Sequence, residues 1–251
     1  MLYTLRTRIK KEIIAEFIPS ISESNKVIIL CGGMPSYPAK SELMFFLSSK
    51  GYWVFLPRYR GSWESDGLFL QKSPHLDVIN VIDALSSGFN DLFNGKQYKI
   101  KNPEVYLIGS SFGGSAVILA SIDKRVKKAV ALSPVTDWRV ETKLEPIDWL
   151  AKFTKSAFGN GYRFKQSDWN KLKNGNFFNP IVMVEKLDKN KIYIIHAKDD
   201  EVVYADTSIK FAERLGCKIT LLKRGGHFST SNLIKSNFWK KVNTFFKNKK
   251  T

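Results

Sequence analysis

The fold of this chain is decided by the stretch VYLIGSSFGGSAVILA, residues 105–120. Four apolar residues lead into Gly109-Ser110-Ser111-Phe112-Gly113, and a second, mostly apolar run follows it. This order predicts a buried strand, a sharp turn and a helix. A G-x-S-x-G pattern in that setting is typical of a nucleophile elbow, where strain lifts the serine clear of the sheet and the helix N-terminus points at the reacting oxygen. Ser111 is therefore the candidate nucleophile.

The composition indicates one globular domain. The chain has 251 residues, of which 43% are hydrophobic, so we expect a single domain over residues 1–251 with one sizeable core. The first residues lack the apolar block of a signal peptide, and no apolar run approaches the roughly 18 residues of a membrane span. The two cysteines, Cys31 and Cys217, make no disulfide framework. These features favour a cytoplasmic protein.

The formal net charge of +17 has two interpretations. One is a basic groove that follows nucleic-acid phosphates, and the other is a lysine-rich solvated surface. Basic residues are spread along the whole chain without a nucleic-acid motif, which favours the second, although some attraction for anionic substrates follows from it. Near the C-terminus, residues 238–247 mix aromatic and basic side chains at helical spacing. That helix either lies on a membrane or, as we favour, packs its aromatic face on a core.

Strand-like and helix-like segments alternate along the chain. Eight segments have the pattern of strands: residues 2–9, 12–18, 27–31, 52–56, 104–108, 129–132, 192–195 and 219–222. Helices are expected over residues 40–50, closed by Gly51, and after Ser73-Pro74, with the serine as N-cap. This alternation predicts the α/β class, with a mostly parallel eight-stranded sheet that helices cover on both faces.

The segment between residues 133 and 191 is too long for an ordinary connection. Its aromatic residues are Trp138, Trp149, Phe153, Phe158, Tyr162, Phe164, Trp169, Phe177 and Phe178. Two interpretations stay open. The segment, about residues 134–190, forms a small, partly helical cap near the site, or it is an excursion with a minor core of its own.

A serine hydroxyl needs a general base, and the chain has three histidines. His75 opens a predicted helix next to Pro74, and His196 ends a predicted strand, where packing is the more ordinary role. His227 follows Gly225-Gly226 in a loop after the last predicted strand. That loop returns to the carboxyl edge of the sheet, where the elbow also emerges, so His227 is the candidate base.

A carboxylate must orient that base. The run over residues 194–203 offers Asp199, Asp200 and Glu201 just after a strand. Asp200 is the preferred acid, Asp199 is the fallback, and Asp137, after the preceding strand, is a second candidate. The spacing of these acids matches no EF-hand calcium loop, and neither a metal nor another cofactor is expected.

Attack on a carbonyl also requires N–H groups that meet the developing oxyanion. The Phe112 N–H, immediately after the nucleophile, is one expected donor. The other should lie in the loop Cys31-Gly32-Gly33-Met34, where glycines let the backbone approach the substrate closely. We place it at Gly33, with Met34 as the neighbouring candidate; an ordinary tight turn would have the same sequence.

Ser111, Asp200 and His227 stand in the chain order of an α/β-hydrolase, each after its own predicted strand. More narrowly, the chain resembles the catalytic domain of the prolyl oligopeptidase family of serine hydrolases from about residue 26 onward. Five segments carry this resemblance: YRGS at 59–62, GSSFGG at 109–114, SPVTDW at 133–138, IHAKDDEVV at 195–203 and GHF at 226–228. The resemblance implies Ser111 as nucleophile, Asp200 as acid, His227 as base, and a carbonyl substrate processed through an acyl-enzyme.

The chain departs from that family's pattern in three ways. It shows no N-terminal β-propeller, the domain that restricts substrate size in the oligopeptidases. Cys31 stands where relatives often have a histidine, or a tyrosine whose hydroxyl serves the oxyanion, and a thiol is a poor donor. Ala197 replaces a usual glycine, and Tyr204 a common proline. The first two departures favour a small esterase or amidase, or an aminopeptidase-like enzyme, over an oligopeptidase.

Two functions of different class follow. The first is a serine hydrolase that cleaves ester or amide bonds of a small-molecule or short-peptide substrate. The second is a non-catalytic binding protein of the same fold for an anionic ligand, suggested by the net charge and the altered loop at Cys31. A nucleic-acid binder is a distant third. The complete set of serine, acid and histidine favours the first function.

Overall fold

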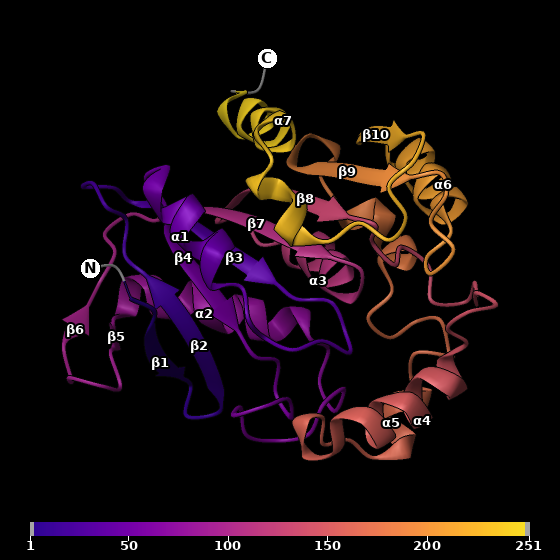
Figure 1. Ribbon diagram of the computed structural model, residues 1–251, viewed down its shortest axis with the longest axis horizontal. Coiled ribbons are helices and arrows are strands. Elements are labelled where there is room, and N and C mark those ends of the chain that lie inside the picture. The colour runs from indigo at the N-terminus through magenta and orange to yellow at the C-terminus, as the bar shows by residue number, and fades with distance from the viewer. Residues whose placement is uncertain (1–2, 249–251) are drawn as a thin grey trace.

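The computed structural model describes residues 3–248 and is built around one large sheet (Figure 1). Its eight strands lie in the order β1-β2-β4-β3-β7-β8-β9-β10. Their bounds are Leu5–Ile9 for β1, Ile13–Ile18 for β2, Lys26–Cys31 for β3, Trp53–Pro57 for β4, Glu104–Ser110 for β7, Val126–Leu132 for β8, Ile192–Ala197 for β9 and Lys218–Leu222 for β10. Strands β1, β2 and β4 pair antiparallel, and every pairing from β4 to β10 is parallel.

This sheet confirms the predicted fold class and all eight predicted strands. Strand ends differ from the predictions by at most three residues, and Leu2, in the first predicted strand, lies outside the described residues. A small hairpin of β5 (Phe89–Asn90) and β6 (Gln97–Tyr98) was not predicted from the sequence. Strands of two residues are too short to leave a periodic pattern.

The central strands are apolar along most of their length because helices cover both faces of the sheet. Helices α2 (His75–Ser87), α3 (Phe112–Ala120) and α6 (Ala205–Leu215) bury their apolar side chains in the larger core on one face. Helices α1 (Ser41–Ser49) and α7 (Ser236–Lys247) pack in the second core on the other face. Among the described residues, no helix combines the length and the apolar character needed to cross a bilayer.

Two helices can be compared in detail with the expectations from sequence. Helix α2 begins at His75, and Ser73 does not cap it, because the Ser73 Oγ lies 2.8 Å from the His75 Nδ1 instead. Pro74 still adopts helical angles, with φ of −58° and ψ of −25°. Helix α7 buries its aromatic face, including Trp239 and Phe245, in the second core, which is the alternative that the sequence analysis favoured over a membrane surface.

Residues 133–191 connect β8 to β9 and are partly helical. They contain α4 (Ile147–Phe158), α5 (Gln166–Asn170) and the short 3-10 helices η1 (Gly159–Gly161), η2 (Pro180–Lys186) and η3 (Lys189–Lys191). The buried side chains of this segment join the larger core; among them are Trp138, Ile147, Leu150, Tyr162, Trp169, Leu172 and Phe178. The Ser36 N–H donates to the Tyr162 hydroxyl at 3.1 Å, and the Trp63 N–H donates to the Gly161 carbonyl at 2.8 Å. The segment is thereby attached to the loops that follow β3 and β4.

Candidate active site

Ser111 occupies the turn between β7 and α3. Its backbone has a left-handed φ of 54° with ψ of −122°, a conformation that residues with a side chain rarely adopt. Backbone hydrogen bonds hold this conformation: the Ser111 N–H donates to the Leu132 carbonyl at 3.0 Å, and the Ser111 carbonyl accepts from the Gly114 N–H at 2.9 Å. The turn therefore fixes the Ser111 side chain at the carboxyl edge of the sheet.

Glycines permit this turn because other backbone segments approach it closely. A Cβ added to Gly109 would collide with the Gly113 carbonyl, and a Cβ added to Gly113 would collide with the Cys31 carbonyl. A Cβ added to Gly114 would lie 2.5 Å from the Cβ of Pro134. The elbow is thus packed directly against the chain that leaves β3 and the chain that leaves β8.

The structure brings the preferred base and the preferred acid together. The Nδ1 of His227 lies 2.9 Å from Oδ2 and 3.2 Å from Oδ1 of Asp200. The Asp200 side chain is fully buried, whereas 27% of the His227 side chain is exposed. The backbone N–H groups of Val202 and Val203 donate to Asp200 Oδ1 at 3.0 and 2.9 Å. Because Nδ1 faces the carboxylate, Nε2 is the nitrogen of His227 that faces away from it.

Asp200 stays ionised despite its burial. Burial alone would raise its pKa, but hydrogen bonds from His196 and His227, together with the Val203 N–H, favour the charged form more strongly. The balance holds the pKa of Asp200 well below its ordinary value. The carboxylate is therefore negatively charged at neutral pH and fixes the Nδ1–H tautomer of His227.

His196 belongs to this arrangement, although the sequence indicated only a packing role. Its ring is fully buried, and Nε2 lies 3.1 Å from Asp200 Oδ2 and 2.9 Å from the Val203 carbonyl. Its Nδ1 lies 2.9 Å from the Ser208 hydroxyl. Because a carbonyl oxygen only accepts, Nε2 carries a proton and is the donor in these contacts. His196 thus donates to the carboxylate that His227 also contacts.

The other two candidate acids have different partners. Asp199 accepts hydrogen bonds from the N–H groups of Gly226 at 2.9 Å and Gly225 at 3.2 Å, and these bonds lower its pKa. It therefore shapes the loop that leads to the histidine. Asp137 forms an ion pair with Arg139 at 2.7 Å. Within residues 3–248, neither carboxylate contacts the imidazole of the candidate base.

All three candidate oxyanion residues lie close to the nucleophile. A Cβ added to Gly33 would lie 3.4 Å from the Ser111 Cβ and 4.0 Å from its Oγ. Phe112 is the first residue of α3, so its N–H is one that the helix itself leaves unpaired. Met34 lines the same cavity as Ser111 and Phe112. The choice of donors among these residues stays a prediction.

Cys31 is the last residue of β3 and directly precedes the loop with the predicted oxyanion donors. Its thiol is buried in the larger core, and burial raises its pKa to about 12. The Tyr59 hydroxyl donates to the Gly32 carbonyl at 3.2 Å and so steadies the residue before Gly33. Cys31 itself is not among the described residues that line the cavity beside Ser111.

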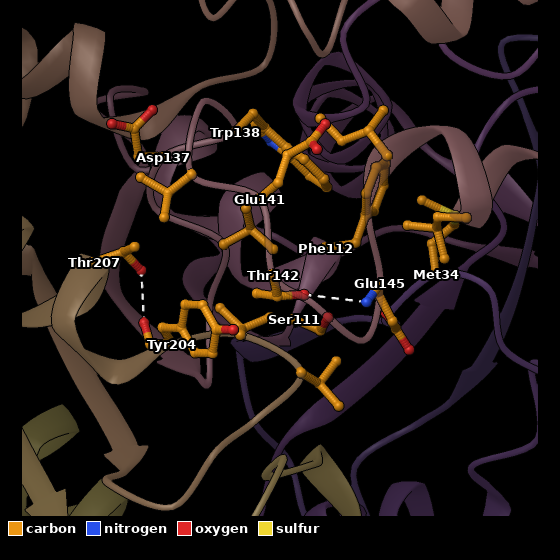
Figure 2. A pocket seen from close by; sticks show the side chains of 16 residues that line it. Met34, Ser111, Phe112, Asp137, Trp138, Glu141, Thr142, Glu145, Tyr204 and Thr207 are labelled. Carbon is orange, nitrogen blue, oxygen red and sulfur yellow. Dashed lines mark hydrogen bonds between the residues drawn. The ribbon is translucent and has the colours of Figure 1, made fainter.

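A narrow cavity of about 50 Å³ opens beside Ser111 (Figure 2). Its wall is mainly apolar, formed by Met34, Phe112, Val135, Trp138, Val140, Ile147, Leu150, Val202 and Val203. The charged side chains among the described lining residues are all acidic: Asp137, Glu141 and Glu145. In a chain of net charge +17, an acidic cavity wall is unexpected from composition.

Glu145 is the acid most closely associated with the catalytic candidates. It lines the same cavity as Ser111, and Figure 2 shows it on the other side of that cavity from Asp137. Burial raises the pKa of Glu145, while the nearby charges of His227 and Asp200 act in opposite directions. The sequence analysis missed Glu141 and Glu145 because they precede α4 in an irregular stretch, and no periodicity marks them as lining residues.

The chain matches the prolyl oligopeptidase family by its sequence profile over residues 38–248, and no curated protein matches it significantly. An esterase structure from Pyrococcus furiosus is similar, with a TM-score of 0.69 and 18% identity over 98% of this chain and 90% of that chain.

Peptidases share the same fold. An acylaminoacyl peptidase from Pyrococcus horikoshii gives a TM-score of 0.67 with 19% identity, over 100% of this chain and 42% of that chain. Dipeptidyl peptidase 4 from Porphyromonas gingivalis gives 0.64 with 15% identity, over 99% and 35%. This chain therefore spans less than half the length of either peptidase, and at these identities the likeness supports the fold alone.

Proposed function

The chain belongs to the prolyl oligopeptidase family of serine hydrolases, and on that premise we propose that it cleaves ester or amide bonds of small substrates through Ser111, His227 and Asp200. The observation that carries this proposal is the pairing of His227 with the buried, ionised Asp200. That pairing turns the Nε2 of the imidazole away from the acid, which is the orientation a general base for Ser111 requires.

The proposed reaction has two halves. His227 Nε2 takes the proton of the Ser111 hydroxyl while Oγ attacks the substrate carbonyl, and the oxyanion accepts from the Phe112 N–H and from Gly33 or Met34. His227, now an imidazolium beside Asp200, protonates the leaving alcohol or amine, and an acyl-enzyme remains. In the second half His227 takes a proton from water, hydroxide attacks the acyl carbon, and the acid product leaves as Ser111 regains its proton.

The cavity favours a small, neutral or cationic group next to the scissile bond. Its volume of about 50 Å³ suits a short side chain, and its mainly apolar wall suits an apolar one. Glu141 and Glu145 disfavour a carboxylate or phosphate there because like charges repel. We propose that residues 134–190 act as a cap on a single α/β-hydrolase domain, since they supply much of this wall.

A non-catalytic binding protein for an anionic ligand is the alternative. The net charge of +17 suggested this alternative, but the described lining of the cavity beside Ser111 contains no lysine or arginine. The local charge therefore opposes an anion at this place. The hydrolase remains the proposal.

The test combines a covalent probe with a substrate panel. A fluorophosphonate probe should label the wild type and Ser110→Ala, and it should not label Ser111→Ala. Ser110 is the matched control because it is the neighbouring elbow serine and lies buried in β7. The panel contains short-chain and long-chain esters with aminoacyl and peptidyl amides. Labelling or turnover that persists in Ser111→Ala would exclude the assignment, and a folded wild type that cleaves nothing would favour the binding protein.

A further inference from the structure

A second, larger cavity lies at the opposite edge of the sheet from Ser111. It is lined where β3, β7 and β8 begin, by residues that include Lys26, Glu104 and Val126. Strand β7 runs from Glu104 to Ser110, which is about 20 Å at the usual rise per residue. The cavity has a volume of about 580 Å³ and is separate from the catalytic candidates.

Lysines dominate this cavity, which we call the lysine groove. Six of its thirteen described lining residues are lysines: Lys26, Lys124, Lys127, Lys128, Lys191 and Lys247. In the whole chain, lysine and arginine together make up 40 of 251 residues, about one in six. The described lining of the groove is therefore far richer in basic residues than the chain as a whole.

Among the described lining residues of the groove, six lysines stand against one acidic residue. Its one described acidic lining residue is Glu104, which hydrogen-bonds to the Tyr106 hydroxyl. Lys26, Lys124 and Lys127 are exposed, and none of them forms an ion pair with a carboxylate in residues 3–248. Bringing several such ammonium groups together is unfavourable unless a counter-charge approaches them.

Two further lysines are held in fixed positions. The Lys128 Nζ donates to the Asn190 carbonyl at 2.8 Å, and the Lys191 Nζ donates to the Asp123 carbonyl at 3.1 Å. Both of these contacts are with backbone carbonyl oxygens. The groove thus combines hydrogen-bonded lysines with exposed ones.

We propose that the lysine groove binds a small oligoanion of the polyphosphate type. Lysine binds phosphate as a point charge, without the planar, paired geometry that arginine offers to carboxylates. A volume of about 580 Å³ is in the range of small-molecule sites, which suits a phosphate chain or a nucleotide better than an extended surface. This site does not depend on the proposed hydrolysis. Under this proposal, anions bind at the edge of the sheet opposite Ser111.

Calorimetric titration with inorganic tripolyphosphate tests the proposal. At low ionic strength the wild type should show saturable binding with a stoichiometry near one. The triple variant Lys26→Gln, Lys124→Gln, Lys127→Gln should weaken this binding at least tenfold. The control triple variant Lys152→Gln, Lys165→Gln, Lys186→Gln removes the same charge from exposed lysines elsewhere and should change it less than twofold. Ser111→Ala should bind like the wild type, so the outcome does not depend on catalysis.

Three results would overturn the proposal. The first is an equal loss of binding in both triple variants, which would reveal only the effect of net charge. The second is the absence of tripolyphosphate binding by the folded wild type. The third is groove-dependent binding of phosphatidylserine vesicles or of a single-stranded oligonucleotide without tripolyphosphate binding, which would assign the groove to a membrane or to nucleic acid.

Discussion

The hydroxyl of Ser133 accepts a hydrogen bond from the backbone N–H of Phe228 at 3.0 Å, in the buried interior. Ser133 directly follows β8, next to the strand that carries the elbow, and Phe228 directly follows His227. This one contact ties the loop of the candidate base to the end of the central sheet. The position of His227 therefore depends on a serine far from it in sequence.

Replacing Ser133 by alanine should loosen that loop. The buried Phe228 N–H would lose its partner, at a cost of about 1–3 kcal/mol in unfolding free energy. Turnover should fall roughly tenfold as His227 moves, because small misplacements of catalytic groups are costly. Urea unfolding and ester hydrolysis measure the two effects. Ser121→Ala, another buried serine, is the control and should leave turnover unchanged. Wild-type activity in Ser133→Ala would contradict the proposed tie.

Replacing Asp200 by asparagine should reduce kcat by about three to four orders of magnitude, because an amide favours the wrong tautomer of the base. Asp199→Asn should cost less than roughly tenfold, since the Asp199 carboxylate accepts from the backbone N–H groups of Gly225 and Gly226 rather than from His227. Asp137→Asn should also be mild. Steady-state kinetics on one activated ester compares the three variants. A crippled Asp137→Asn beside a mild Asp200→Asn would reverse the assignment of the acid.

Adding a methyl group to Gly33 should crowd the nucleophile. The new Cβ would lie 3.4 Å from the Ser111 Cβ, in the space that an oxyanion needs, while φ at Gly33 lies outside the left-handed region. We expect Gly33→Ala to lower kcat/KM by on the order of 10- to 100-fold with little loss of stability. Gly32→Ala is the matched control, because its Cβ would meet only the Ser36 Oγ at 3.7 Å. Equal effects of the two variants would place the oxyanion elsewhere.

The candidate catalytic residues that follow strands were predictable from sequence, whereas the residues that line the cavity were not. Buried parallel strands are continuous apolar runs, so β3, β7 and β9 were visible, and the residue types that follow such strands identified Ser111 and His227 as candidates. Glu141 and Glu145 have no such signal, because the packing of residues 133–191 on the core decides where they point.

The contact of His196 with Asp200 shows the same limit at a finer scale. The two residues are four apart, but they lie at the end of a strand and in a loop, where spacing alone does not indicate a shared side. A buried histidine near the end of β9 has the same sequence pattern whether it packs or donates. Only the position of the Val203 carbonyl shows that its Nε2 is a donor.

His196→Asn tests whether this residue positions the acid. Without the second imidazole, fewer hydrogen-bond donors stabilise the negative charge of Asp200. The carboxylate then stabilises a proton on His227 more strongly. We expect kcat/KM to fall by about 10- to 100-fold, KM to change little, and the acid limb of the pH–rate profile to move to higher pH. Ser208→Ala should shift the limb in the same direction by less. A fall in kcat without any movement of the limb would indicate a merely structural role.

His75 should make stability depend on pH. Burial lowers the pKa of His75 from 6.5 to about 4, so the unfolded chain takes up a proton first as the pH falls. Its contribution to stability is complete above about pH 6.5 and is lost towards pH 4, by at most about 3 kcal/mol. Urea unfolding of the wild type and of His75→Gln should therefore diverge on acidification, with the variant losing less. Parallel curves would contradict the shift.

The left-handed backbone at Ser111 has a consequence for how this protein can change over time. Residues with a side chain are destabilised in that conformation by about 1–3 kcal/mol, and glycine is not. A chain that lost its nucleophile to glycine would therefore gain stability at the same step at which it lost activity. Selection for a stable fold and selection for turnover therefore act in opposite directions at this single position.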